Sequence, residues 1–239
     1  MRIQSYAFSS PGGREENQDH VSLREDKNAG IYILADGLGG HEDGQKASEM
    51  ASKWMELAWK PEKYDEPEVW LKEQFHTANR LLEKYAEIKK VKIRTTLVVL
   101  MLDDKSAVWA HTGDSRLYYL HGGKIDRFTA DHSVAYKKYK SGEISRTEIG
   151  RDDDQNALLR TLGSTDRWEP DTDKCSLEPG DAFLLCSDGF WEYVRDEEIL
   201  FDLLKSDTPR EWAEHLLVRV MGRIEQGNDN LSVITVIVD

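Results

Sequence analysis

The sequence predicts an α+β fold in which two antiparallel sheets pack face to face and helices cover their outer sides. Two long amphipathic segments, 45–59 and 67–89, follow each other, and four apolar segments then come without a helix between them. A doubly wound parallel sheet would alternate strands with helices instead. Consecutive strands with short turns pair antiparallel, and the neighbouring helices are available to cover a sheet face.

The predicted strands are short runs rich in Ile, Val, Leu, Tyr and Thr, and several end in Gly or Asp. They cover residues 30–36, 95–103, 106–114, 115–123, 124–129, 181–188 and 231–239. Between the fourth and fifth runs, Gly122-Gly123 predicts the tight turn of a hairpin.

Three segments predict helices because their apolar residues recur at steps of three and four. These segments are 45–59, 67–89 and about 209–225. Pro67 and Pro209 stand where the last two begin, which suits the first turn of a helix.

Composition limits the class of protein. The 239 residues include 45 acidic and 32 basic side chains, a formal net charge of −13, so nucleic acid and anionic membranes are not expected partners. The N-terminus lacks the apolar core of a signal peptide, and no run approaches the roughly 18 apolar residues of a membrane span. Cys175 and Cys186 form no CxxC pair and are predicted to be buried free thiols. We expect a cytoplasmic protein, and a single domain over residues 1–239, because no linker or repeat divides the chain.

Aspartates stand at the ends of several predicted strands. Asp36 follows GIYILA and Asp188 follows DAFLLCS, and each is followed by glycine. Asp-Gly after a strand is a common hairpin signal, so a turn role stays open. Both pairs lead into helical patterns, however, whereas a hairpin turn would lead into another strand. Asp19 and Asp229 also flank apolar segments.

Such aspartates could meet at one edge of a sandwich. Carboxylates a few Å apart resist joint ionisation, and divalent cations would relieve their repulsion. No HExxH spacing or cysteine pair suggests zinc, whereas oxygen ligands suit Mg²⁺ or Mn²⁺. Two such ions can activate a water and hold a phosphoryl group. On spacing alone, ordinary strand-end aspartates remain the alternative.

Six motifs then appear in order along the chain. They are RxxNQD (14–19), DGLGGH (36–41), GDSR (113–116), DH (131–132), LLCSDGFW (184–191) and DNLSVI (229–234). Together they resemble the metal-dependent serine/threonine protein phosphatases of the 2C type, in their compact bacterial form. The resemblance runs from about residue 5 to the C-terminus. It implies a four-layer α-β-β-α sandwich, which agrees with the layers predicted above.

The resemblance implies a role for each aspartate in the motifs. Asp36 would bridge two Mn²⁺ or Mg²⁺ ions, with the Gly37 carbonyl as a further ligand. Asp19 and Asp188 would help to hold the pair, and Asp229 would complete the shell of one ion.

Further roles follow from the same resemblance. Asp131 would bind a third, weaker metal ion, and Arg14 would hold the substrate phosphate with its planar fork of donors. His41 is the candidate general acid for the leaving serine or threonine oxygen, although a histidine after Gly-Gly is also a common loop residue. Asp114 and Arg116 of GDSR are interpreted as a structural pair rather than catalytic residues.

The implied activity is direct hydrolysis of phosphoserine and phosphothreonine in proteins by a hydroxide held between the metals. Such an enzyme would reverse a bacterial-type Ser/Thr kinase, and we expect a monomer. The family also places a flap beside the site, here at about 132–163. Its Lys137, Lys138 and Lys140 form either a solvated helix face or a basic patch that receives the phosphoprotein.

Two departures from the family pattern stand near the site. Arg94 replaces the usual Gly before Thr-Thr, which puts the local packing in doubt, and Leu38 replaces the commoner methionine. Neither change removes a predicted ligand.

Other functions fit the sequence less well than a phosphatase does. A non-catalytic phosphoprotein-binding regulatory relative would have lost metal-ligating aspartates, and none is lost here. A 2C-like phosphatase of a partner-switching circuit would carry a sensor domain, for which this chain has no room. The glycines fit no nucleotide-binding pattern, and Cys186 lacks the CxxxxxR loop of a cysteine phosphatase.

Overall fold

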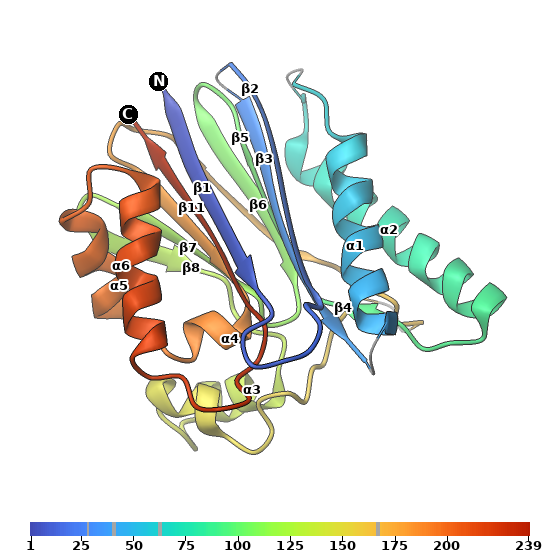
Figure 1. Cartoon of the computed structure of the whole chain (residues 1–239). Helices are drawn as coiled ribbons and strands as arrows, with labels where there is room; N and C mark the ends of the chain where they lie inside the picture. The colour runs from blue at the N-terminus through green and yellow to red at the C-terminus, as the bar shows by residue number, and fades with distance from the viewer. Residues whose placement is uncertain (28, 40–41, 62–63, 166–167) are drawn as a thin grey trace.

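Two antiparallel sheets pack face to face in the computed structural model, with helices on their outer sides (Figure 1). The structure describes residues 1–239 except 28, 40–41, 62–63 and 166–167. The order of layers is helix, sheet, sheet, helix. The predicted α+β class and the four-layer α-β-β-α sandwich are therefore confirmed.

Each sheet contains strands from distant parts of the chain. The first sheet has the order β1 (Ile3–Ser10), β11 (Leu231–Val238), β10 (Ala182–Cys186), β7 (Arg116–His121), β8 (Lys124–Phe128). The second has the order β2 (Asp19–Asp26), β3 (Ala29–Leu38), β5 (Leu97–Leu102), β6 (Ser106–Thr112), β9 (Asp171–Ser176), and the short β4 (Arg94–Thr95) pairs with the end of β3.

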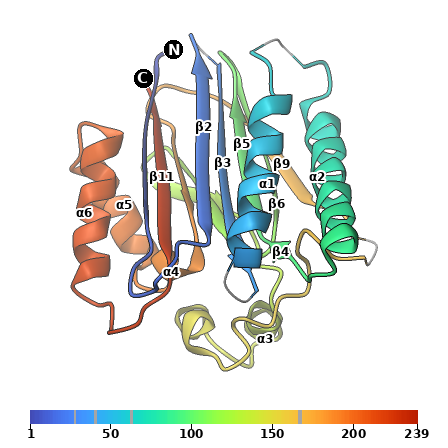
Figure 2. The same cartoon turned by 45° about the vertical axis from the view of Figure 1, so that its right-hand side comes forward.

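The helices divide between the two outer faces. On the second sheet lie α1 (Glu42–Ala58) and α2 (Pro67–Lys89), and on the first lie α5 (Asp196–Leu204) and α6 (Pro209–Met221) (Figure 2). Pro67 and Pro209 stand in the first turns of their helices, as predicted. Among the described helices, none combines the length and apolar character needed to cross a membrane.

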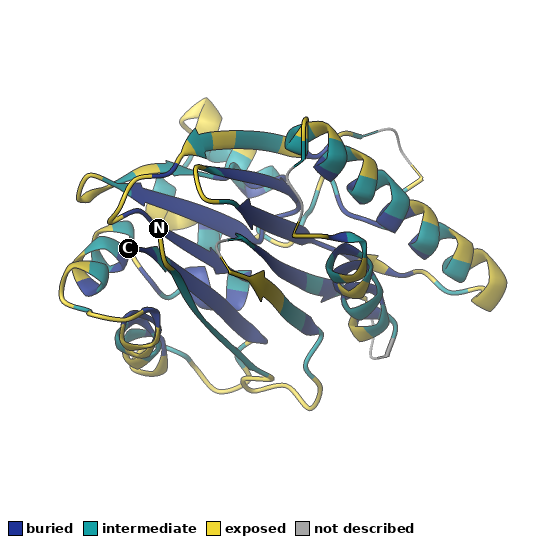
Figure 3. Ribbon diagram, turned by 90° about the horizontal axis from the view of Figure 1, so that it is seen from above, coloured by how far each residue is buried: buried dark blue, intermediate teal, exposed yellow. Residues whose placement is uncertain are grey.

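Alternating side chains divide the core into three layers. On β3, Ile31 and Ile33 pack against α1 and α2, whereas Tyr32 and Leu34 point to the other sheet. Phe183 on β10 meets them from the opposite side. This alternation is the period of two that places successive strand residues on opposite faces. Figure 3 shows the strands as the buried centre of the molecule and exposed residues on the outer faces of the helices.

The strands that the sequence did not predict are β1, most of β2 and β9. The sequence of β9, DTDKCS, is polar because this strand lies at the edge of its sheet. Cys175 in β9 is half-buried and Cys186 is buried, and both are free thiols, so burial is confirmed fully only for Cys186.

The segment 132–163, which we call the flap, carries α3 (Val134–Ser141) and the short 3₁₀ helix η1 (Arg146–Arg151). It lies at the lower end of the sandwich in Figure 1. The Leu159 amide donates to the His132 carbonyl at 2.7 Å, so the two ends of the flap are tied together.

The two chain ends lie at the opposite end of the sandwich. The amide of Arg2 donates to the carbonyl of Asp239, and the amide of Asp239 donates to the carbonyl of Arg2, both at 2.8 Å. The pairing continues through β1 and β11 down to Ser10 and Leu231 (Figure 1).

The packing between the sheets predicts a large cost for truncating Phe183. Its side chain is fully buried and stacks on Tyr119 with ring centroids 5.0 Å apart. Phe183→Ala is expected to lower the free energy of unfolding by about 3–5 kcal/mol. Phe201→Ala is the matched control, since Phe201 is 61% exposed, and it is expected to change little. Chemical denaturation of both variants measures the difference, and equal effects would contradict the assignment.

Candidate metal centre

Aspartates from both sheets meet at the lower end of the sandwich. Asp19 begins β2 and Asp36 lies near the end of β3, and the two residues stand directly opposite each other in the antiparallel register. Directly opposed residues share a face of the sheet. Asp188 begins α4 (Asp188–Trp191) immediately after β10, and Asp229 precedes β11. The structure therefore brings together the aspartates predicted to hold the core metals.

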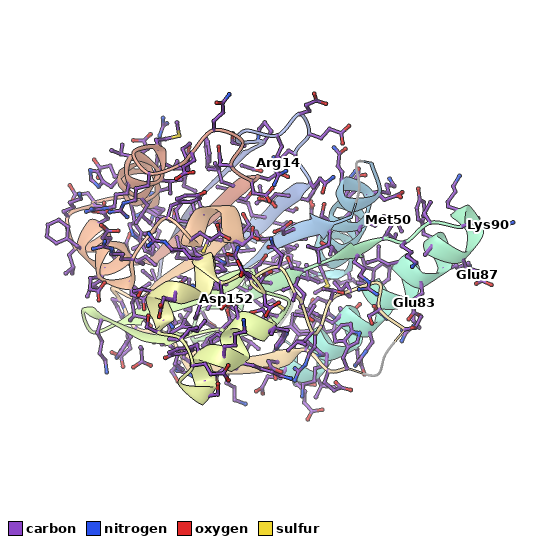
Figure 4. All side chains as sticks on the ribbon, turned by 90° about the horizontal axis from the view of Figure 1, so that it is seen from below. Arg14, Met50, Glu83, Glu87, Lys90 and Asp152 are labelled. Carbon is purple, nitrogen blue, oxygen red and sulfur yellow. The ribbon has the colours of Figure 1, made fainter. Side chains whose placement is uncertain are left out.

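Three of these aspartates line a cleft of about 490 Å³, and Asp19 lies buried beside it. Its lining includes Arg14, Asp36, Gly37, Asp188 and Asp229. Figure 4 views this end from below, with Arg14 on the loop between β1 and β2 and Asp152 on the flap.

Hydrogen bonds fix the backbone of Asp36. Its carbonyl accepts from the Thr96 amide and from the Thr95 hydroxyl, each at 2.8 Å, and its amide donates to the Thr96 hydroxyl at 2.9 Å. Arg94, the departure noted in the sequence, lies exposed in β4 opposite Leu38. The substitution thus leaves these bonds to Asp36 intact.

Gly37 lies in a place where a side chain does not fit. A Cβ at this position would stand 2.1 Å from the carbonyl oxygen of Gly44, in the first turns of α1. Glycine is therefore required for the close approach between the end of β3 and this helix. The carbonyl of Gly37 remains a predicted metal ligand.

Burial and mutual repulsion raise the pKa values of the carboxyls. Burial, with the charges of Asp188 and Asp229 adding to it, raises the pKa of Asp19 to about 7. Burial and Asp229 raise the pKa of Asp188 to about 6. Burial, Asp188 and Asp19 hold the pKa of Asp36 well above its usual range. Without compensating positive charge, the cluster resists full ionisation at neutral pH.

The oxygens available here fit divalent cations. One oxygen of Asp19, Oδ2, accepts from the Ser187 hydroxyl at 2.8 Å, whereas Oδ1 is buried without a partner among the described residues. A buried oxygen without a hydrogen bond is costly, and a cation would satisfy it. A set of carboxylate and carbonyl oxygens without sulfur suits Mn²⁺ or Mg²⁺.

Arg14 stands at the exposed edge of the cleft. Its Nη2 lies 3.0 Å from Asp229 Oδ2, with about half of each side chain exposed. An ion pair this exposed is weak, so the guanidinium can turn to a phosphate. The loop that carries Arg14 is held by Asn230, whose side chain bonds to Pro11, Glu16 and Gln18.

The predicted pairing of Asp114 with Arg116 within GDSR is wrong. Arg116 binds Asp131, not Asp114, through Nε–Oδ1 at 2.8 Å and Nη2–Oδ2 at 2.7 Å, and it stacks on Trp191 at 3.4 Å. Both oxygens of Asp131 are thus occupied by a buried guanidinium. The structure places Asp131 beside the cluster but engages it elsewhere, and its role as ligand of a third ion stays a prediction.

Two further carboxyls interact with this cluster: Asp114, which was interpreted as structural, and Glu192, which had no predicted role. Burial and the charge of Asp188 raise the pKa of Asp114 well above its usual range. Burial, Asp188 and Asp114 raise the pKa of Glu192 to about 9. Asp114 and Glu192 therefore extend the cluster of buried carboxyls around Asp188. The signal was present in the sequence, because Glu192 follows Asp188 by four residues, which places both on one helical face.

His41, the predicted general acid, lies outside the described residues. Its role as general acid stays a prediction.

A second cluster with metal-ligand chemistry, His111, His132 and Asp171, lies at the base of the flap. Its groups already have partners. His132 Nδ1 accepts from the Gly113 amide at 3.2 Å, and Arg160 Nη1 donates to Asp171 Oδ1 at 2.7 Å. A neutral imidazole that accepts at Nδ1 carries its proton on Nε2, where a metal would need a lone pair. These contacts connect the base of the flap to the second sheet.

Comparison with known proteins decides the family. The model of the family described as Protein phosphatase 2C matches residues 13–218. The chain belongs to the protein phosphatase 2C family. The resemblance drawn from the six motifs is therefore confirmed.

Several members of the 2C family are similar over nearly their whole length. The serine/threonine phosphatase stp of Listeria welshimeri is 35% identical over 231 residues, which cover 93% of this chain and 90% of that protein. The protein phosphatase PhpP of Streptococcus pneumoniae is 33% identical over 226 residues, covering 92% of this chain and 91% of the relative.

Solved structures of 2C-type phosphatases share the fold. The phosphatase Stp1 of Staphylococcus aureus superposes with a TM-score of 0.90 at 27% identity, covering 100% of this chain and 96% of that one. The catalytic domain of the phosphatase PstP in complex with two manganese ions gives a TM-score of 0.85 at 26% identity, covering 99% of each chain. The metal dependence of the family agrees with the oxygen-rich site found here.

The repulsion within the cluster predicts opposite effects of Asp36→Asn with and without metal. In EDTA, the variant is expected to unfold at a higher temperature than the wild type, because folding no longer has to bury the Asp36 carboxyl among other acidic groups. With Mn²⁺ at about 100 times its Kd, the wild type should gain roughly 5–10 °C and the variant much less. Thermal unfolding in both buffers measures this. The exposed Asp153→Asn variant is the control and should follow the wild type.

Proposed function

We propose that the chain hydrolyses the phosphate ester of phosphoserine and phosphothreonine in proteins, with Mn²⁺ or Mg²⁺ as cofactor. Membership of the protein phosphatase 2C family supports this, as do relatives that are named serine/threonine phosphatases. The observation that carries the proposal is the convergence of Asp36, Asp188 and Asp229 in one cleft with Arg14, while Asp19 lies buried directly opposite Asp36 in the strand register. The cleft thus combines ligands for cations with a donor for phosphate.

Each group of this chain has a defined task. Asp19, Asp36, Asp188 and Asp229 would hold the two core ions, with the Gly37 carbonyl as a further oxygen. When bound, the ions lower the pKa of a water molecule and neutralise charge on the phosphoryl group.

The remaining groups act on the substrate. Arg14 would donate two parallel hydrogen bonds to phosphate oxygens, for which a guanidinium is well shaped. The departing serine or threonine oxygen needs a proton, and His41 remains the proposed donor. Asp131 stays the ligand predicted for a third ion, although both of its oxygens bind Arg116; the buried carboxyls of Asp114 and Glu192 are further candidates for that ion.

A non-catalytic phosphoprotein-binding relative is disfavoured. Such a relative would have lost acidic ligands, whereas here every aspartate predicted for the core site is present in the sequence. The family match and the similarity to a manganese-bound phosphatase structure favour the enzyme.

Finer assignments are further parts of the proposal. Phosphorylated proteins are the substrates, and a Ser/Thr kinase of the bacterial type would supply them. Free thiols at Cys175 and Cys186 support a reducing, cytoplasmic setting. Helices cover the outer face of each sheet, which supports a monomeric, single-domain protein in which the flap belongs to the active site.

Hydrolysis of an aryl phosphate tests the proposal directly. Activity is expected with Mn²⁺, and it should fall to background in EDTA and return when Mn²⁺ is restored. Asp36→Asn should lower kcat/KM by at least 10²-fold with Mn²⁺ present, because Asp36 would be one of the carboxylates that hold the ions. Activity that survives both chelation and this substitution would overturn the metal assignment.

The basic patch of the flap can be tested with a sharper choice of residues. Lys138 is engaged, because its Nζ lies 2.8 Å from Asp152 Oδ1 and 2.7 Å from Asp154 Oδ2. Lys137 and Lys140 are exposed and carry no ion pair among the described residues. If the patch receives substrate, replacing both by Ala should raise KM several-fold more for a phosphoprotein than for an aryl phosphate.

A matched pair on α2 controls for the loss of two positive charges. Lys84 and Lys89 are exposed on α2, outside the flap and the cleft lining, and Ala at both positions should leave the two KM values alike. If the flap variant changes KM equally for both substrates, the lysines do not receive the phosphoprotein and form only a solvated helix face.

A further inference from the structure

The return segment of the flap is held rigidly beside the cleft. The Val134 amide donates to the Ala157 carbonyl at 3.0 Å, and the Leu159 amide to the His132 carbonyl at 2.7 Å. A few residues later the amide of Leu162 donates to the carbonyl of Thr95 at 2.9 Å. Because Thr95 also bonds to Asp36, the flap and the metal centre share one framework.

The turn that precedes this segment is fixed on its other side. The Gln155 amide donates to the Asp152 carbonyl and the Ala157 amide to the Asp154 carbonyl, both at 3.0 Å. The side chain of Gln155 bonds to Glu192. These contacts hold the backbone on both sides of residue 156.

Asn156 is the flap residue that lines the cleft together with Arg14, Asp36, Asp188 and Asp229. Its side chain is exposed, and the described hydrogen bonds include none to its amide group. A polar side chain on a fixed backbone, facing the cleft without a partner, is available to a ligand.

The chemistry of the side chain selects the part of the substrate that it can bind. A carboxamide offers N–H donors and a carbonyl acceptor side by side, which is the pattern of a peptide group. A phosphate only accepts, and the cleft already provides Arg14 for it, beside the carboxylates that would hold phosphate-binding cations. A peptide main chain beside the phosphorylated residue offers both a donor and an acceptor to Asn156.

We propose that Asn156 binds the substrate main chain next to the phosphorylated serine or threonine, so that the flap distinguishes a phosphorylated peptide from a small phosphate ester. The inference rests on the proposed phosphatase function. It adds a substrate-binding residue on the flap side of the cleft, opposite the metal ligands on the strands.

The first test compares two substrates in Asn156→Ala. Loss of one net hydrogen bond should lower kcat/KM for a phosphopeptide by roughly 3- to 10-fold, chiefly through KM, and by a smaller factor for an aryl phosphate. Asp153→Ala removes an exposed polar side chain of similar size from the same loop, outside the cleft lining, and should behave as the wild type. Melting temperatures verify that both variants fold.

The second test addresses the main chain itself. Phosphopeptides are made with an N-methyl group on the peptide nitrogen before or after phosphoserine. With the wild type, one of the two methylated peptides should lose several-fold in kcat/KM. With Asn156→Ala, methylation should have little further effect, because the two changes remove the same bond.

Two results would overturn the inference: equal losses of Asn156→Ala on peptide and aryl phosphate, or methylation effects that are as large in the variant as in the wild type. Failure of the proposed function is distinguishable, because then the wild type with Mn²⁺ would hydrolyse neither substrate.

Discussion

Electrostatic repulsion among the carboxylates at the lower end of the sandwich is the constraint on which the structure depends. Asp19, Asp36 and Asp188 have raised pKa values because burial is combined with neighbouring negative charge. A fold that only had to be stable would not gather them. Their cost is tolerated because the layers around them are large and well packed, and because cations offset the repulsion when they bind.

The site lies across the boundary between the two sheets. Asp19 and Asp36 belong to the second sheet, whereas Asp188 and Asp229 stand at the ends of strands in the first. The Ser187 hydroxyl, from the first sheet, donates to Asp19 in the second and joins the two halves. Catalytic geometry therefore depends on how one sheet is seated on the other, so the central core serves the active site as well as the stability of the fold.

Helices and strands could be predicted where neighbouring residues in the sequence alone determine the element. Strand β11 is a run rich in Ile and Val, helix α2 shows a clear helical periodicity, and Asp36-Gly37 stands out because it leads into a helix. Strand β9 shows no apolar pattern, since it lies at the edge of its sheet and its residues are half-buried or exposed. Arg116 binds Asp131 rather than Asp114 because the choice is made by strands that meet only in three dimensions. Motifs identified the carboxylates, but not their partners.

Paired chain ends carry a consequence for how this enzyme can be built into larger assemblies. Strand β11 spans eight residues from Leu231 to Val238, so the C-terminus and the adjoining N-terminus lie about 25 Å from the carboxylates. A tether, a reporter or a neighbouring domain fused at either end starts from the face that substrates do not approach. A short peptide could join the two ends, and the gene could then be opened at an exposed loop elsewhere.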